Sequence, residues 1–221
     1  MKTRRFLSVV MLLFASAAPV WADDQAASVD LLQKRATQGD AKAQTSLGFL
    51  YEQGQGVPRD YAEALKWYRL AAAQGYASAQ HNLGFMYANG QGVPQDDAEA
   101  LKWFRLAAAQ GLAAAQTSLG VMYDTGRGVP QDYAEALNWF RRAAAQGDAK
   151  AQLSLGVMYA DGQGVPQDYV QAYKWLDLAA ATYTDKHDHD VAGNARDSVA
   201  ARMTPAQIAE AQKLAREWKK Q

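Results

Sequence analysis

The stretch Gly39–Gln74 decides the fold of this chain; it reads GDAKAQTSLGFLYEQGQGVPRDYAEALKWYRLAAAQ. Three further copies follow without a gap and open at Gly75, Gly111 and Gly147, each 36 residues after the one before. Repetition at a fixed period of this length is typical of an array in which each unit packs against its neighbours. The sequence therefore predicts four repeats, over residues 39–74, 75–110, 111–146 and 147–182.

Each unit has the pattern of two helices. The first is predicted from about Asp40 to Gln53, with apolar residues at helical spacing, and it is ended by glycines and a following proline. The second begins at Asp60, whose carboxylate is placed to accept amide hydrogens of the first turn. Glu63, three residues on, is placed to return a hydrogen bond and complete a capping box. The fold class is therefore all-α, and the repeats predict an α/α solenoid.

The small residues of each unit indicate how its helices pack. Gly48 lies in the middle of the first predicted helix, where glycine costs about 1 kcal/mol relative to alanine. We expect the second helix to approach closely at this point, with Trp67 and Tyr51 filling the space around the contact. The alanine run at 71–73 is expected to offer a flat surface to the first helix of the next unit.

Residues 1–22 have the features of a secretory signal peptide. Three basic residues precede an apolar core over residues 6–18, and small residues stand at the recognition positions before a cleavage site after Ala22. A membrane anchor is the alternative, but the apolar core is shorter than the about 20 residues that a spanning helix needs. The mature chain is therefore predicted to start at Asp23, to be periplasmic or secreted, and to have no stable membrane insertion.

Atypical segments flank the repeats on both sides. Residues 23–38 are predicted to form an N-terminal capping helix. Residues 183–221 are predicted to hold an irregular polar extension, which the sequence indicates from Thr182 to Asp190, and then a helix near Val191–Met203. A last helix follows, with Thr204 as its cap and a proline in its first turn. Such segments cover the apolar faces that an array exposes at its two ends.

The charge and the cysteine content exclude several classes of function. The whole chain has 23 basic and 23 acidic side chains, and removal of residues 1–22 leaves 20 basic and 23 acidic ones. This balance does not favour binding to nucleic acid or to an anionic membrane. The sequence contains no cysteine, so disulfides and thiol catalysis are excluded.

The repeat resembles a known one. Ala43–Trp67 and its three later copies share the pattern A-x-x-x-L-G-x-x-Y-x-x-G-x-G-V-x-x-D-x-x-x-A-x-x-W, which resembles the Sel-one-like repeat, a relative of the tetratricopeptide repeat. The tail Met203–Trp218 also looks like the end of many bacterial members. The resemblance implies antiparallel helix pairs in a right-handed superhelix. It further implies a role as an adaptor or scaffold for protein assembly or envelope signalling, without any shared chemistry.

The four copies differ most on one face of the first helices, away from the side that carries Leu47, Gly48 and Tyr51. In the resembled repeats this face lines the concave groove. The alternative is that these positions vary because they are merely solvated, but Phe49 and Phe85 are of a size rarely left in water as a row. The predicted partner-binding residues are Thr45, Phe49, Glu52, His81, Phe85, Asn89, Thr117, Val121, Asp124, Leu153 and Val157.

No catalytic, cofactor or metal site is predicted. The acidic residues at the starts of the second helices recur in every unit, as expected of caps, whereas a catalytic residue is needed only once. The run from His187 to Asp190 holds potential zinc ligands in His187 and His189, but their alternation within a polar segment favours a solvated loop. The repeated G-x-G-V-P glycines follow a helix and precede a proline, so they do not form a phosphate-binding loop.

Two classes of function remain open. The favoured prediction is an exported, non-enzymatic interaction module that holds a peptide or a helix of an envelope protein in its groove. Its partner would be a protein or peptide of unspecified identity, and the oligomeric state is left open. The alternative is an envelope enzyme, or a modulator of an enzyme that acts on peptidoglycan, for which only residues 183–197 offer a non-repeating polar region.

Overall fold

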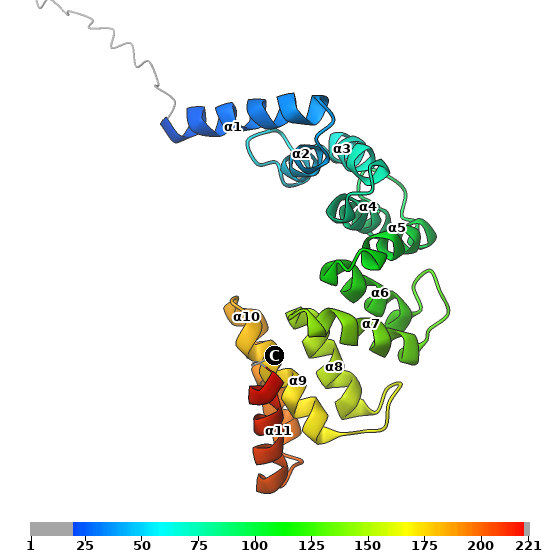
Figure 1. Ribbon diagram of the computed structural model, residues 1–221, viewed down its shortest axis with the longest axis vertical. Helices are drawn as coiled ribbons and strands as arrows, with labels where there is room; N and C mark the ends of the chain where they lie inside the picture. The colour runs from blue at the N-terminus through cyan, green and yellow to red at the C-terminus, as the bar shows by residue number, and fades with distance from the viewer. Residues whose placement is uncertain (1–19, 219–221) are drawn as a thin grey trace, which may run out of the picture.

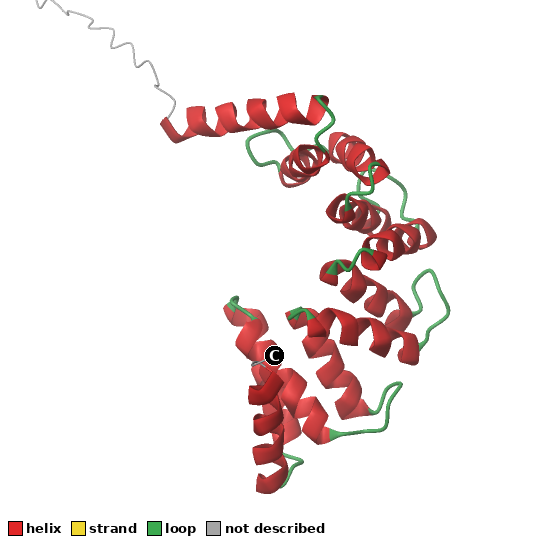
Figure 2. Cartoon of the chain, viewed as in Figure 1, coloured by secondary structure: helices red, strands yellow, loops and turns green. Residues whose placement is uncertain are grey.

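The computed structural model describes residues 20–218, and all regular structure within that range is α-helical (Figure 2). The prediction of an all-α solenoid is therefore confirmed. The helices are α1 (Val20–Thr37), α2 (Ala41–Gln53), α3 (Tyr61–Ala73), α4 (Ala77–Asn89), α5 (Asp97–Ala109), α6 (Ala113–Thr125), α7 (Tyr133–Ala145), α8 (Ala149–Asp161), α9 (Tyr169–Thr182), α10 (Lys186–Ala200) and α11 (Pro205–Trp218).

Helices α2 to α9 form four pairs that follow one another along an arc (Figure 1). The two helices of a pair make the most extensive contact, and the second helix of each pair packs on the first helix of the next. The second contact uses the predicted alanine surface, since Ala71 and Ala72 are buried in one cluster with Ala79 and Leu83 of α4. The core is therefore a row of similar clusters, one at each joint of the array.

The mid-helix glycines permit the close approach that was expected. A Cβ atom on Gly48 would lie 2.8 Å from the ring of Tyr68 and 3.2 Å from the carbonyl oxygen of Ala64. Phe104, Phe140 and Leu176 take the place of Tyr68 in the later repeats. The prediction that Trp67 fills this space is wrong by one residue. The residue after the tryptophan points at the glycine, whereas Trp67 packs with Ala36 of α1 and with Leu47.

The second helices are capped by aspartate as predicted, but the capping box is half right. Asp60 accepts hydrogen bonds from the backbone N–H groups of Ala62 (2.8 Å) and Glu63 (3.1 Å). The backbone N–H of Asp60 donates to the carbonyl of Tyr51 at 2.9 Å, and the carboxylate of Glu63 accepts from Lys66 instead. The same backbone bond recurs in all four repeats, so it ties the start of each second helix to the end of the first.

Buried glutamines link each unit to the one before it. The side-chain amide of Gln44 donates to the carbonyl of Ala36 at 3.0 Å, and the amide of Gln74 donates to the Gln44 side-chain oxygen at 2.7 Å. Within the next two repeats equivalent bonds join Gln80 to Gln110 and Gln116 to Gln146. The amides of Gln80, Gln116 and Gln152 donate to carbonyls of the preceding unit at 3.4, 3.5 and 3.5 Å. In the fourth repeat Thr182 replaces the outer glutamine and contacts Gln152 at 3.3 Å. A polar ladder thus runs along the apolar interfaces of the array.

The C-terminal segment departs from the repeats. Helices α10 and α11 both pack mainly on α9, and the ring of Trp218 meets that of Trp175 edge-on at a centroid distance of 4.9 Å. The prediction of an irregular segment up to Asp190 is wrong in its second half, because α10 already begins at Lys186. Asp185 caps this helix by accepting from the backbone N–H groups of its first turn.

The last helix begins as the sequence predicts. Thr204 and Gln207 exchange hydrogen bonds in a capping box, with the Gln207 N–H donating to the Thr204 hydroxyl at 3.3 Å. The signal-peptide prediction falls on residues 1–22 and so lies almost wholly outside the described residues. Within residues 20–218, none of the helices has the length and apolar character needed to cross a bilayer.

Candidate partner-binding groove

The predicted partner-binding residues all lie on the four first helices, α2, α4, α6 and α8. Four of them occupy the same place in successive repeats, 36 residues apart: Phe49, Phe85, Val121 and Val157. Their side chains are 44%, 44%, 42% and 41% exposed, although all four are large and apolar. The structure therefore presents a row of apolar side chains along the first helices, one from each repeat.

Three of the predicted residues are held within the fold itself. Thr45 and Thr117 are buried, because their position lies where the variable face meets the packed face of the helix. The Thr45 hydroxyl donates to the carbonyl of Ala41 in its own helix at 2.8 Å. Glu52 is half-buried and accepts a hydrogen bond of 2.6 Å from the hydroxyl of Tyr68. Desolvation and this carboxylate together raise the pKa of Tyr68, so its hydroxyl stays protonated.

His81 connects two repeats from a half-buried position. Its Nε2 lies 3.2 Å from the Ser118 hydroxyl on α6, and its ring lies 5.5 Å from that of Phe104 on α5. Burial lowers the pKa of His81 below its ordinary value, because the charged imidazolium is poorly solvated there. At neutral pH the imidazole is therefore neutral and one of its nitrogens can accept a hydrogen bond.

Phe85, Val121 and Val157 of the row line cavities. One, of about 230 Å³, is lined by Phe85, Asn89, Thr117 and Val121 among others, and it shares part of its lining with a cavity of about 390 Å³ that also includes His81. A further cavity of about 240 Å³ is lined by Asp124, Leu153 and Val157. Eight of the eleven predicted residues thus line one or another of these three cavities on the first helices.

The three remaining residues, Thr45, Phe49 and Glu52, lie on α2 at the N-terminal end of the row, beside none of these cavities. Asp124 differs from its neighbours in the groove because it is an acid within an apolar lining. Burial raises the pKa of its carboxyl group.

Sequence reasoning missed several residues that line the cavities. Arg127 enters from the loop after α6, Lys150 from the first turn of α8, and Tyr183 from the turn after α9. Departure from the repeat was a usable signal for Arg127, because the other three units carry glutamine at its position. Lys150 lies on the variable face, but repeat 1 carries the same residue, Lys42, at the equivalent position. Tyr183 lies beyond the last repeat, where no comparison between repeats is possible.

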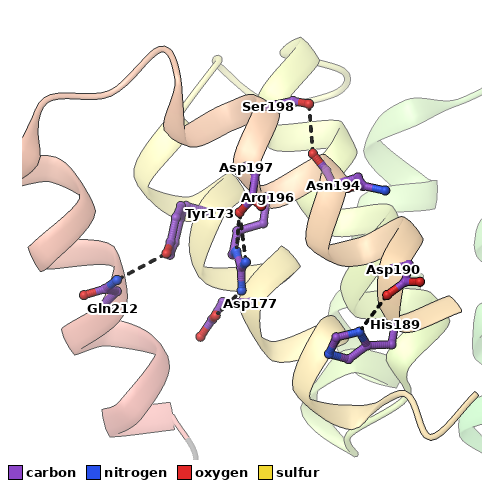
Figure 3. A network of polar contacts seen from close by, with 9 residues as sticks. All are labelled: Tyr173, Asp177, His189, Asp190, Asn194, Arg196, Asp197, Ser198 and Gln212. Atoms are coloured by element: carbon purple, nitrogen blue, oxygen red, sulfur yellow. Dashed lines mark hydrogen bonds and ion pairs between the residues drawn. The ribbon is translucent and has the colours of Figure 1, made fainter. Parts of the chain in front are cut away.

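The non-repeating polar region at the C-terminus shows ordinary structural contacts (Figure 3). The Ser198 hydroxyl donates to the Asn194 carbonyl at 2.8 Å, and Arg196 pairs with Asp177 and Asp197. His189 meets only its neighbour Asp190, at 3.4 Å. No nucleophile and histidine are paired among these residues.

The two candidate zinc ligands do not converge on one point. His187 and His189 are two residues apart on α10, so they point about 200° apart around the helix axis. Residues 28–218, whose side chains the structure describes, contain no group of three or more acidic or histidine side chains arranged to hold a metal ion.

The profile of the Sel1 repeat matches residues 41–76, 77–112, 113–148 and 149–181, which is more than half of the chain. This chain belongs to the Sel1 repeat family. Sel1 repeats generally serve as scaffolds for protein–protein interaction and are typically non-catalytic. No curated protein gives a significant match to the chain.

Solved Sel1 repeat structures are similar to this chain over most of its length. It is 46% identical to c5321, a protective antigen of uropathogenic Escherichia coli, with a TM-score of 0.68 over 72% of this chain and 34% of that one. It is 40% identical to a Sel1 repeat protein of Oxalobacter formigenes, with a TM-score of 0.66 over 77% and 50% of the two chains. The chain therefore spans only a third to a half of these relatives. The immunity protein Pa5087 of Pseudomonas aeruginosa, 20% identical with a TM-score of 0.51 over 83% of each chain, shares the fold alone.

Proposed function

We propose that this Sel1 repeat protein is an exported, non-enzymatic interaction module that holds a peptide or a helix of an envelope protein in the groove on its first helices. The observation that supports this most directly is the row formed by Phe49, Phe85, Val121 and Val157. A row of exposed apolar side chains beside cavities is typical of a surface that becomes buried against a partner. In this array the row lies on the helix face where the four units differ most.

The packing of the row argues against a purely structural role. Phe85 is 44% exposed, whereas its neighbours Leu83 and Met86 in the same helix are fully buried. Truncation of a core phenylalanine costs about 3–5 kcal/mol, and we expect Phe85→Ala to cost well under that. A loss of stability in the core range would assign Phe85 to the core and remove the groove's central residue.

The contacts of the acidic residues support a non-enzymatic role. Asp60, Asp96, Asp132 and Asp168 each use a carboxylate oxygen to accept two backbone N–H groups at the start of a second helix. Each carboxylate is therefore already engaged in capping, in the same way in every repeat. In the groove the Nε2 of His81 lies 3.2 Å from the Ser118 hydroxyl, but that hydroxyl donates to the carbonyl of Ala114 at 3.0 Å, so His81 is not placed to take its proton as a general base would.

Crosslinked co-purification from the cell envelope tests the proposal. Phe49→Ala/Phe85→Ala is the test variant, and Leu70→Ala/Leu106→Ala is a matched control. The control removes two leucines that are 45% and 44% exposed but lie on the second helices. We expect one envelope protein to be captured by the wild type and the control and lost by the test variant. Loss from both variants, or from neither, would contradict binding in the groove.

Export rests on residues 1–22 and is tested separately. We expect the chain produced in a bacterial host to be found in the periplasm or the medium, with an N-terminus at Asp23. Such cleavage removes the first residues of α1 and leaves Asp23–Thr37 to cover the first repeat. Recovery of the intact chain from the cytoplasm would contradict export and leave the interaction proposal to the co-purification experiment.

A further inference from the structure

The groove is not uniform along its length. The cavity of about 230 Å³ between α4 and α6, here called the α4–α6 pocket, is lined by Phe85, Phe104, Thr117, Val121, Arg127 and Lys150 among others. It shares Phe85, Thr117 and Lys150 with the neighbouring cavity of about 390 Å³. These two cavities form one depression across three first helices, which gives the proposed groove a distinct centre.

A difference in side-chain size helps to open this pocket. The exposed apolar position of the first helix is phenylalanine in repeats 1 and 2 but valine in repeats 3 and 4. At Val121 the pocket therefore lacks the volume of an aromatic ring that the same fold accommodates at Phe49 and Phe85. The lining is mainly apolar, so an apolar side chain from a partner would be the favourable occupant of this space.

The charges at the pocket are positive. Arg127 and Lys150 line it, and no acidic residue does. Arg127 is held in place by two hydrogen bonds to Asp97, of 2.6 and 3.3 Å, and by one to the carbonyl of Ala88 at 2.7 Å. Lys150 has no ion-pair partner among residues 28–218. Asp148, on the rim of the neighbouring cavity, is engaged as the cap of α8 through the Ala151 N–H.

One polar group of the pocket lacks a partner. Thr117 is 8% exposed, and its hydroxyl makes no hydrogen bond to any described residue. The hydroxyl of Thr45, at the same position in repeat 1, donates to the carbonyl one turn earlier. The Thr117 oxygen has almost no accessible surface, so it is not a contact point for an occupant of the pocket.

We infer that the α4–α6 pocket receives one bulky apolar side chain of a peptide, and that Lys150 binds a carboxylate of the same peptide close to that side chain. The inference rests on the proposed function and adds the chemistry of the partner. Arg127 is already paired with Asp97, so Lys150 supplies the unpaired positive charge of the site. The partner is therefore a peptide segment that combines an acidic residue with a bulky apolar one.

Phage display of random linear peptides against the mature chain tests this inference. Enriched peptides are synthesised, and their affinities for each variant are measured by fluorescence anisotropy. Val121→Phe fills the pocket with the residue that repeats 1 and 2 already carry, so the fold tolerates it. Lys150→Glu reverses the charge. Lys42→Glu makes the same change at the equivalent position in repeat 1, outside the lining of the pocket. Circular dichroism and melting confirm that each variant is folded.

We expect enriched peptides to combine Asp or Glu with a large apolar residue. Val121→Phe and Lys150→Glu should each weaken binding about tenfold or more, and Lys42→Glu should change it less than about twofold. Display against Lys150→Glu should enrich basic peptides in place of acidic ones. This change of preference is a readout that a merely structural role of Lys150 would not produce.

Several results would overturn the inference. Peptides that lose affinity for Phe49→Ala/Phe85→Ala but bind Val121→Phe and Lys150→Glu as tightly as the wild type would preserve the groove and refute the pocket. Peptides that bind every variant equally would contradict both the pocket and the groove. Enrichment of no linear peptide would refute the pocket, and the co-purification experiment would then decide whether the groove binds a folded partner.

Discussion

At the scale of the residue, the positions that break the repeat are the most informative. His81 replaces a threonine of repeats 1 and 3, and Arg127 replaces a glutamine of the other three units. Asp97 likewise replaces a tyrosine at the start of the second helix, and it is the residue that Arg127 binds. The second and third repeats therefore each carry one change of a compensated pair, Asp97 and Arg127, which joins the loop of the third repeat to the second helix of the repeat before it.

His81 makes the stability of the array depend on pH. Because burial lowers its pKa in the folded chain, the unfolded chain takes up the proton first as the pH falls below about 6.5. The free energy of unfolding is therefore highest above that pH and decreases down to the pKa of the folded state. Each unit by which the two pKa values differ contributes about 1.4 kcal/mol.

We predict that His81→Thr, which installs the residue of repeats 1 and 3, removes this part of the pH dependence. Urea unfolding at neutral pH and at about pH 5 measures it. The two exposed histidines of α10 remain in the variant, so they serve as an internal control. An unchanged difference between the two pH values would show that His81 is not the group responsible.

The Asp97–Arg127 pair gives a second prediction, which concerns an ion pair and a lower pH range. Arg127→Gln should lower the free energy of unfolding by about 1 kcal/mol at neutral pH, since the pair is only partly exposed and doubly hydrogen-bonded. The hydrogen bonds from Arg127 hold the pKa of Asp97 below its ordinary value. The stabilisation is therefore present above about pH 4 and is lost as the pH falls through the folded pKa.

Urea unfolding at about pH 7 and pH 3 checks this prediction, and the variant should approach the wild type in acid. Asp97→Tyr/Arg127→Gln restores the residues of the other units, which are tyrosine in repeats 1, 3 and 4 at the first position and glutamine in repeats 1, 2 and 4 at the second. This double variant should recover most of the lost stability. A double variant no better than Arg127→Gln would mean that the two positions are not coupled.

At the scale of the element, the sequence predicts the helices well because their signals are local. Aspartate caps, glycines past the helix ends and the 36-residue period together locate α2 to α9 to within a residue or two. The sequence is less informative about which side chain meets which. Tyr68 and not Trp67 faces Gly48, because a single step along a helix turns the side chain by about 100°.

The start of α10 shows the limit of composition as a signal. Polar, charged residues at 185–190 suggest a loop, yet Asp185 caps a helix whose first turn is formed by these residues. Lys186 and Asp190 support it with an ion pair one turn apart. Variation among the repeats predicted eight residues that line the cavities. It did not predict Arg127 or Tyr183, because these reach the cavities from the segments after α6 and α9, whose path the repeat pattern does not determine.

The glycine contact between paired helices gives a prediction for the element. A Cβ on Gly84 would lie 2.8 Å from the ring of Phe104 and 3.1 Å from a backbone oxygen of α5. Gly84→Leu should therefore cost several kcal/mol, more than the about 1–3 kcal/mol typical of overpacking. Thermal melting measures the change, with Gly193→Ala as a control at a glycine that has open space around it. A melting temperature unmoved by Gly84→Leu would disprove this account of the packing.

At the scale of the whole molecule, the C-terminal helices close the array by covering α9. Leu178 is almost fully buried there, in a cluster with Ala215 of α11, whereas Leu70 and Leu106 at the same position in repeats 1 and 2 are about half exposed. Lys174 lies over the rings of both Trp175 and Trp218, and burial lowers its pKa. The aromatic contact between α9 and α11 is therefore one of several contacts that fix the end of the array.

We predict that Trp218→Ala destabilises the protein by about 1–3 kcal/mol, since a partly buried aromatic pair is lost. Because each repeat contacts only its neighbours, the loss should be local. Hydrogen exchange should show faster exchange in α9 and α10 and unchanged protection in α2 and α3. Uniformly faster exchange along the chain would indicate that the four repeats unfold as a single cooperative unit.

The glutamine ladder has a mechanical consequence for the whole molecule. Each repeat is joined to the preceding segment by the same buried side-chain amide, from Gln44, Gln80, Gln116 and Gln152 in turn, so we expect the joints to have similar stiffness, with no dedicated hinge among them. Small rotations at the successive joints therefore add up, and the arc bends evenly along its length. A ligand that spans several repeats would set the curvature of the arc, and the distance between the two ends of the array would report how far the ligand has bent it.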